Sequence, residues 1–207
     1  MTNVLIVEDS KITRKAIERN LGLSPDFRVI AAIEDAANAE VACLAGSIDL
    51  ILMDVCTKNQ HSGLEAAEKI KRANPRIKVV IMTSMPEYSF LKRARQAHCD
   101  GFWYKEYGEA DLLEVCRRAV AGECPWPEET PAVQIGLIRS SEFTARELDI
   151  LHELVRGETY ENMAEHLGIS VNTVKYHVKN LLQKTGYKST LQLVADVVEK
   201  QMILPWY

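Results

Sequence analysis

The residues of this sequence that could carry chemistry are five polar side chains in its first half. They are three carboxylates, a hydroxyl and an ammonium: Glu8, Asp9, Asp54, Thr83 and Lys105. Three carboxylates in one crevice repel one another and need a cation or protons. With oxygen ligands only, a hard ion such as Mg²⁺ fits best. A carboxylate beside Mg²⁺ can attack a phosphoryl group, whose oxygens Thr83 and Lys105 could then hold.

These side chains directly follow apolar runs of strand length. The runs cover residues 4–7, 29–33, 50–53, 79–82 and 102–104. They are continuous rather than alternating, which is typical of strands buried on both faces of a parallel sheet. Helical patterns separate them, starting from the N-cap Ser10 and then over about 35–46, 62–73, 86–97 and 108–122.

This alternation predicts a doubly wound α/β domain. Ligands of such domains bind at the carboxyl ends of the strands. In the flavodoxin-like order 2-1-3-4-5, strands 1 and 3 are neighbours, which would bring Glu8, Asp9 and Asp54 together. The alternative for Glu8 and Asp9 is that they merely cap the helix that follows them, because the helix dipole favours acidic residues at its N-terminus. Polar residues at three further strand ends favour the site.

Four motifs resemble the receiver domains of bacterial two-component response regulators. They are VEDS (7–10), LMD (52–54), MTS (82–84) and GFWYK (101–105), and the resemblance spans about residues 2–122. It implies that Asp54 is the phosphoacceptor. It also implies that Asp9, Asp54 and the backbone carbonyl of Cys56 ligate Mg²⁺, with Glu8 acting nearby.

The same resemblance assigns three further roles. Thr83 matches the switch hydroxyl, Phe102 the aromatic that turns inward with it, and Lys105 the phosphate-binding lysine. Two positions depart from the pattern, because Lys58 and Glu106 stand where many receivers have proline. Lys58 would bring a positive charge near the site.

The second half of the chain is predicted to be a small all-α domain. Pro125, Pro127 and Pro131 break the periodicity before it and indicate a connector. The expected boundaries are 1–123 for the receiver, 124–140 for the linker and 141–207 for a four-helix domain. Residues 202–207 are unusually apolar and are expected to pack on their own domain, or else against a receiver or a second subunit.

The third helix of this domain, from Val171 to Lys184, has two stripes. One is apolar, with Val174 and Val178, and the other carries Lys175 and Lys179. Residues 171–188 hold four lysines and no acid. Charge alone is also typical of a solvated amphipathic helix, so the lysines do not settle the function.

Three further motifs resemble the LuxR-type (NarL/FixJ-type) helix-turn-helix domain over about residues 141–203. They are FTARE (143–147), MAEHLGIS (163–170) and TVKYHVKNL (173–181). The resemblance implies that Lys175, Tyr176 and Lys179 face base edges and phosphates, with Thr173 and His177 as backbone contacts. The stretch 160–162 and Thr190 depart from the pattern by removing positive potential.

Composition narrows the class of protein. The chain has 207 residues and a net charge of −4, so DNA binding would need a local basic face. No apolar run approaches the roughly 20 residues of a membrane helix, and a cytoplasmic location with no membrane partner is expected. The five cysteines form no CxxC pair, so neither a disulfide framework nor a zinc site is expected.

The leading interpretation is a transcription regulator controlled by Mg²⁺-dependent phosphorylation of Asp54. Its expected partners are a sensor histidine kinase, double-stranded DNA at paired half-sites, and a second copy of the chain when active. Lys58 motivates a first alternative, a phosphorylation-independent DNA binder that uses the receiver as a dimer or ligand platform. A turnover enzyme is a weaker alternative, because Cys56 stands where a second catalytic acid would help; the chain is expected not to be one.

Overall fold

The computed structural model describes residues 1–106 and 111–205. The chain folds into two compact units. The first unit comprises residues 1–84 and 89–129, and the second comprises residues 85–88 and 130–207. Among the described residues, no helix is long and apolar enough to cross a membrane.

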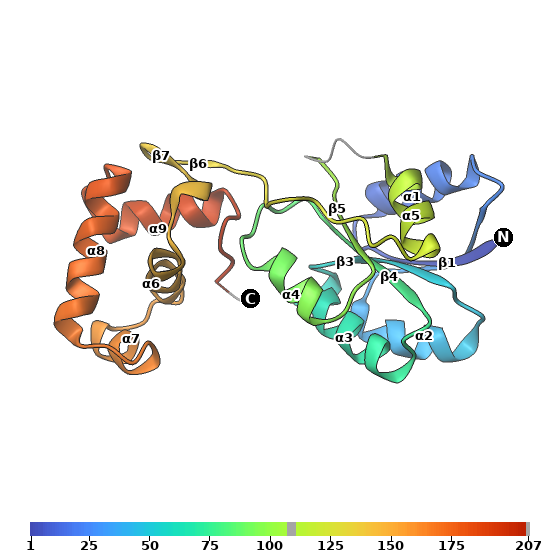
Figure 1. The fold of residues 1–207 in the computed structure, drawn as a ribbon, viewed down its shortest axis with the longest axis horizontal. Helices are drawn as coiled ribbons and strands as arrows, with labels where there is room; N and C mark the ends of the chain where they lie inside the picture. The colour runs from blue at the N-terminus through green and yellow to red at the C-terminus, as the bar shows by residue number, and fades with distance from the viewer. Residues whose placement is uncertain (107–110, 206–207) are drawn as a thin grey trace. The chain divides into compact units, whose positions relative to one another are not determined.

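The first unit is built on a parallel sheet of five strands in the order β2-β1-β3-β4-β5, as predicted. The strands are β1 (Thr2–Val7), β2 (Phe27–Ile33), β3 (Leu50–Asp54), β4 (Lys78–Thr83) and β5 (Gly101–Tyr104). Their helices are α1 (Lys11–Gly22), α2 (Ala39–Ala45), α3 (Gly63–Ala73), α4 (Phe90–Gln96) and α5 (Leu112–Ala121). Figure 1 shows α1 and α5 on one side of the sheet and α2, α3 and α4 on the other.

The continuous apolar runs are explained by this two-sided cover. Alternate residues such as Val4, Ile6 and Leu52 pack with Ile17 and Leu21 of α1. The residues between them are equally inaccessible to solvent: Leu5, Val7, Ile51, Met53, Val79 and Ile81 are all fully buried. The helices on both faces therefore leave no polar side for the strands β1, β3 and β4.

Three helices differ from their predicted bounds. The pattern over 35–46 begins as a 3₁₀ turn, Ala36–Asn38, before α2. The pattern over 86–97 becomes α4 only from Phe90, with Ser89 at the N-cap position. The pattern over 108–122 is described only from residue 111, since residues 107–110 lie outside the described part.

The chain after α5 returns to the edge of the sheet. The Phe102 N–H donates to the Pro125 carbonyl over 3.1 Å, so the outer side of β5 is engaged. The ring of Trp126 lies 6.2 Å from that of Phe102, centroid to centroid. The guanidinium of Arg95 from α4 lies 5.3 Å from the centroid of the Trp126 ring. The first residues of the predicted linker thus belong to the packing of the first unit.

The second unit contains the four predicted helices. They are α6 (Ala145–Val155), α7 (Tyr160–His166), α8 (Val171–Thr185) and α9 (Thr190–Glu199). A short hairpin precedes them, formed by β6 (Gln134–Ile135) and β7 (Ile138–Arg139), and it falls within the predicted linker range. Ile135 is fully buried in the core of this unit, so part of that range is packed rather than exposed.

The apolar ending packs on its own unit. Met202 and Ile203 are fully buried in the core formed with α6, α8 and α9. Leu204 is buried as well, whereas Trp206 and Tyr207 lie outside the described residues.

At the start of α6, Thr144 and Glu147 form the predicted capping box: each side chain accepts the other residue's backbone N–H.

Candidate functional site

Three carboxylates meet at the carboxyl edge of the sheet. β1 and β3 are hydrogen-bonded neighbours, with Val7 opposite Met53, so the residues that follow them lie side by side. One carboxylate oxygen from each of Glu8, Asp9 and Asp54 lies within 4.8 Å of the others. Glu8 and Asp54 are buried, whereas Asp9 is exposed. The predicted acidic cluster is therefore present in the folded chain.

Lys105 reaches this cluster from the end of β5. Its Nζ lies 2.5 Å from Oε2 of Glu8 and 3.0 Å from Oδ1 of Asp54. Only 10 % of the Lys105 side chain is exposed. Burial disfavours the ammonium, but Asp54 and Glu8 outweigh it and raise the pKa of Lys105. The lysine therefore stays charged and partly compensates the carboxylates.

The Asp54 carboxyl has an unusual proton affinity. Burial raises its pKa to about 7 against the opposing pull of the Lys105 ammonium, and the charges of Glu8 and Asp9 add to the rise. Its Oδ1 also accepts the Val55 N–H over 2.9 Å. An additional cation at the cluster would favour the charged carboxylate that nucleophilic attack requires.

The remaining predicted residues of the receiver differ in burial and in their contacts. Thr83 is buried at the end of β4, and its carbonyl accepts the Lys105 N–H over 2.9 Å. Cys56 is half-buried in the loop after Asp54, where it forms a β-bridge with Ser62. Phe102 is buried on β5, and its ring packs against Tyr104 at 4.8 Å between centroids.

The loop after Asp54 is held close to β3 by a glycine. The Gly63 N–H donates to the Val55 carbonyl over 2.8 Å. A Cβ atom at Gly63 would lie 1.9 Å from the backbone oxygen of Asp54. Only glycine permits this approach, so Gly63 fixes where α3 begins relative to the phosphoacceptor candidate.

The donor set fits a divalent cation. Carboxylate oxygens from three residues, with the Cys56 carbonyl on the adjoining loop, are the hard ligands that Mg²⁺ takes in proteins. The cluster carries three formal negative charges against the one positive charge of Lys105. A hard cation would therefore both bind to the oxygens and offset the remaining charge.

Sequence reasoning misses three residues that adjoin the site: Arg14, Glu34 and Asp35. Arg14 lies on α1 and donates to the Glu8 carbonyl over 2.6 Å. Glu34 and Asp35 directly follow β2. The rule that finds the other candidates, a polar residue directly after a strand, also points to Glu34 and Asp35. No sequence signal separates Arg14 from the other cations of α1.

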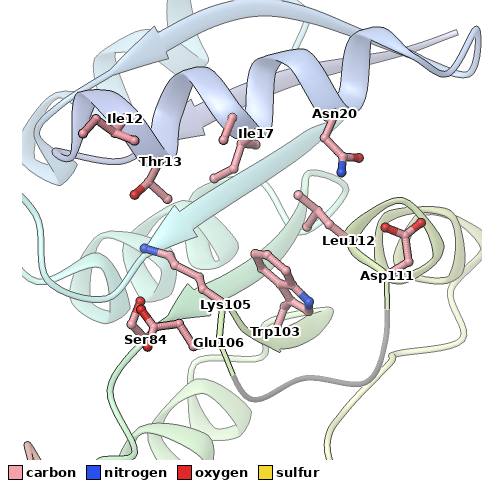
Figure 2. Close-up of a pocket in the computed structure, with 11 residues that line it drawn as sticks. Ile12, Thr13, Ile17, Asn20, Ser84, Trp103, Lys105, Glu106, Asp111 and Leu112 are labelled. Carbon is pink, nitrogen blue, oxygen red and sulfur yellow. The ribbon is translucent and has the colours of Figure 1, made fainter.

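A depression of about 420 Å³ opens between α1 and the end of β5. Figure 2 shows Asn20 of α1, Trp103 of β5 and Asp111 before α5 around it, with Lys105 at one side. The Oδ1 atom of Asn20 is buried and has no hydrogen-bond partner among the described residues. The depression thus adjoins the acidic cluster through Lys105.

The predicted DNA-contact residues lie on α8. The Ser170 side chain caps this helix by accepting the Thr173 N–H over 3.1 Å. Val174 and Val178 are buried and anchor the opposite face of the helix. Lys175 and Lys179 are exposed, and Tyr176 is 62 % exposed. Thr173 and His177 are half-buried.

One of the four lysines counted in the sequence is engaged within the fold. Nζ of Lys184 lies 2.7 Å from Oε2 of Glu147 and 2.8 Å from the Glu142 carbonyl. Burial opposes the charge on Glu147, but the Lys184 ammonium outweighs it and lowers the pKa of that carboxyl. The exposed positive charge of α8 is therefore carried by Lys175 and Lys179.

Two family models match the chain. Residues 4–117 match the response regulator receiver domain, and residues 141–196 match the bacterial regulatory proteins of the luxR family. The nitrate/nitrite response regulator protein NarP of Escherichia coli (strain K12) is 32% identical over 193 residues, covering 90% of this chain and 89% of NarP. The response regulator protein VraR of Staphylococcus aureus (strain Mu3) is 30% identical over 207 residues, covering 97% and 98%.

Solved structures share the fold. A structure described as two RcsB dimers bound to two parallel DNAs has a TM-score of 0.65 at 18% identity, covering 95% of this chain and 97% of that chain. RcsB from Salmonella enterica serovar Typhimurium, bound to the promoter rprA in the presence of the phosphomimetic BeF3-, has a TM-score of 0.64 at 18% identity, covering 95% and 98%. The motifs, both domain matches and the full-length relatives agree: the chain is a two-component response regulator with a LuxR-type DNA-binding domain.

Proposed function

We propose that this response regulator is controlled by phosphorylation of Asp54 and that the phosphorylated form binds DNA through α8. The observation that carries the proposal is the Lys105 ammonium, which lies between two buried carboxylates, 3.0 Å from Oδ1 of Asp54. A buried cation beside a nucleophile can hold the oxygens of an arriving phosphoryl group.

The transfer assigns one role to each residue. A carboxylate oxygen of Asp54 attacks the phosphorus of a phosphohistidine on a sensor kinase. The new P–O bond forms as the P–N bond breaks, and the imidazole leaves. Lys105 and the Thr83 hydroxyl hold the transferred oxygens. This is a stoichiometric transfer to the protein itself, so the chain is not a turnover enzyme.

Glu8, Asp9, Asp54 and the Cys56 carbonyl are the residues that would hold Mg²⁺. When bound, the ion offsets the charge of the carboxylates and of the phosphoryl oxygens. Glu8 has a second task in this chain, because its Oε1 accepts the Ser10 N–H over 3.2 Å at the start of α1. This hydrogen bond links the acidic turn, formed by Glu8 and Asp9, to the start of α1.

In the second unit, Lys175, Tyr176 and Lys179 would contact base edges and phosphates in the major groove. Thr173 and His177 would contact the DNA backbone. With two exposed lysines on α8, one copy neutralises few phosphates. Two copies on paired half-sites double this salt-dependent contribution to affinity, so we propose a homodimer as the active form.

Phe102, turning inward together with Thr83, would carry the signal from the phosphorylation site to the rest of the first unit.

The test is the intact mass of the full chain after incubation with acetyl phosphate, with and without Mg²⁺. The wild type should gain one phosphoryl group only when Mg²⁺ is present, and Asp54→Ala should gain none. Asp149→Ala, which removes an exposed aspartate on α6, is the matched control and should behave as wild type. A wild-type chain that stays unmodified while folded would refute the proposal.

The phosphorylation-independent alternative rests on Lys58. The ammonium of Lys58 lies 3.0 Å from Oε2 of Glu34, so its charge is matched by a carboxylate outside the acidic cluster. Duplex DNA selected from a random pool distinguishes the two functions. Phosphorylated wild type should bind the selected duplex more tightly than Asp54→Ala, whereas equal affinity would favour the alternative.

A further inference from the structure

A single carboxylate bridges two segments that border the acidic cluster. Glu34, which directly follows β2, pairs through Oε1 with Arg14 of α1 and through Oε2 with Lys58 of the loop after Asp54. Both N–O distances are 3.0 Å. The Lys58 ammonium comes first among the causes that lower the pKa of Glu34, and Arg14 adds to it, so the bridging group is charged at neutral pH.

Arg14 connects the bridge to the acidic turn. One guanidinium nitrogen donates to the Glu8 carbonyl over 2.6 Å and lies 3.4 Å from the Asp9 carbonyl. The other guanidinium nitrogen donates to Glu34. Only 13% of the Arg14 side chain is exposed, so its planar fork is held in one orientation. The position of the Glu8–Asp9 backbone is thereby linked to Glu34.

Lys58 connects the bridge to the loop that carries Cys56. Besides the ion pair, the Lys58 N–H donates to the Glu34 carbonyl over 3.1 Å. Asp35, which follows Glu34 in the chain, adds two contacts to the same loop. Its Oδ2 accepts a hydrogen bond from the Asn59 side chain over 3.2 Å, and its Oδ1 lies 2.7 Å from Nδ1 of His61. The two residues that follow β2 therefore hold Lys58, Asn59 and His61.

We propose that Glu34 is a positioning residue for the phosphoacceptor site. Its carboxylate sets the spacing between the Glu8–Asp9 turn and the loop after Asp54, and it keeps the Lys58 ammonium away from the acidic cluster. This inference rests on the proposed function, because it concerns the cation affinity of the same site. Glu34 itself contributes no ligand atom to the cluster.

The bridge acts through geometry and charge placement rather than through its own binding energy. Exposed ion pairs contribute little to stability, and the Glu34 side chain is 46% exposed. Residues that orient ligands have larger effects on metal sites, typically about 10–100-fold in affinity. Loss of the Glu34 charge would loosen both segments and free a 57% exposed ammonium to compete with the cation.

The experiment compares Glu34→Gln with Glu40→Gln in the full chain. Glu40 is the matched control, because its side chain is 49% exposed and lies 3.9 Å from the Lys69 ammonium, away from the cluster. The readout is the initial rate of acetyl phosphate labelling as Mg²⁺ is varied, which separates the half-saturating Mg²⁺ concentration from the maximal rate.

We expect Glu34→Gln to raise the half-saturating Mg²⁺ concentration about tenfold, the lower end of the range for residues that orient ligands, with a much smaller change in the rate at saturating Mg²⁺. Glu40→Gln should match the wild type. If Glu34→Gln also matches the wild type while the wild type is labelled, the inference is wrong but the proposed function stands. If the wild type is not labelled, the proposed function itself fails.

Lys58→Met supplies a second variant in case Glu34→Gln folds poorly. It removes one arm of the bridge and the competing charge together, so it should shift the half-saturating concentration less than Glu34→Gln does. In the double variant, Glu34→Gln should lose part of its effect, because no freed ammonium remains. Strictly additive shifts would overturn the role given to Lys58.

Discussion

The Lys105 ammonium lies 3.0 Å from Oδ1 of Asp54 while it also bonds to Glu8, so one buried cation serves two buried carboxylates. Its charge occupies the position where phosphoryl oxygens are proposed to arrive. The same charge repels a divalent ion at the acidic cluster. Phosphoryl transfer and cation binding should therefore respond in opposite directions when this charge is removed.

Lys105→Met should slow acetyl phosphate labelling of Asp54 by about 100–1,000-fold, the range for loss of one donor that holds developing negative charge. The same variant should bind Mg²⁺ more tightly, by roughly two- to fivefold, because a like charge is gone. Labelling by intact mass and Mg²⁺ titration by calorimetry measure the two effects. Lys92→Met, at an exposed lysine of α4, should change neither. Parallel losses in both measurements would contradict the assignment.

Gly63→Ala should destabilise the first unit by about 1–3 kcal/mol or more, since its Cβ would lie 1.9 Å from the Asp54 oxygen. Labelling of Asp54 should fall as well, because α3 must shift away from β3. Gly22→Ala is the matched control: nothing lies within 4 Å of its Cβ, and it should be neutral or slightly stabilising. Denaturant unfolding measures the free energy of unfolding of both variants. Equal free energies of unfolding would rule out the close contact at Gly63 as the cause.

Lys175→Ala and Lys184→Ala should separate DNA contact from folding. Lys175 is exposed on α8, and its loss should weaken binding to a selected duplex and reduce the salt slope by about one. Lys184 bonds to Glu147 and the Glu142 carbonyl, so its loss should lower the thermal stability with little change in the salt slope. Anisotropy titrations over a range of salt concentrations, with thermal unfolding, distinguish them. An equal slope change for both would contradict the different roles.

His166 should make the stability of the second unit depend on pH. Its Nδ1 lies 2.8 Å from Oε2 of the buried Glu153, and this hydrogen bond, with the nearby charges of Glu158 and Glu165, raises the pKa of His166 above its usual value. The stabilisation is complete below the unfolded pKa of about 6.5 and is lost as the pH rises through the higher folded pKa.

An NMR titration of the His166 ring in the full chain measures this effect. The midpoint should lie above about 6.5 in the wild type and should move down in Glu153→Gln. Glu65→Gln, an exposed change on α3, should leave the midpoint unchanged. A wild-type midpoint at or below 6.5 would refute the pairing as a source of stability.

The strands and the positions of the acidic residues at their ends follow from local signals in the sequence, and the strand order comes from the doubly wound fold class that the alternation predicts. Continuous apolar runs specify buried parallel strands, and polar residues directly after β1 and β3 must then meet at one edge. Asp54 and Lys105 are far apart in the chain, yet their places at strand ends suffice to predict that they converge.

The supporting contacts could not be predicted in the same way. The bridge from Arg14 to Glu34 depends on side-chain directions across α1 and β2, which residue spacing does not fix. Lys184 looks like part of a basic stripe, and only the packing of α8 against α6 reveals that it is paired with Glu147. The hairpin around Gly136 could not be predicted from the sequence, because its two strands have only two residues each and show no periodic pattern.

The hydrogen bond from the Phe102 N–H to the Pro125 carbonyl has a practical consequence. β5 is the last strand of its sheet, and an edge strand with open backbone groups can pair with another chain. A receiver fragment cut directly after α5 would lose this cover and should self-associate. A fragment that ends at Glu129 would retain the hydrogen bond to β5. The segment after α5 therefore protects the edge of the sheet from aggregation, besides connecting the two units.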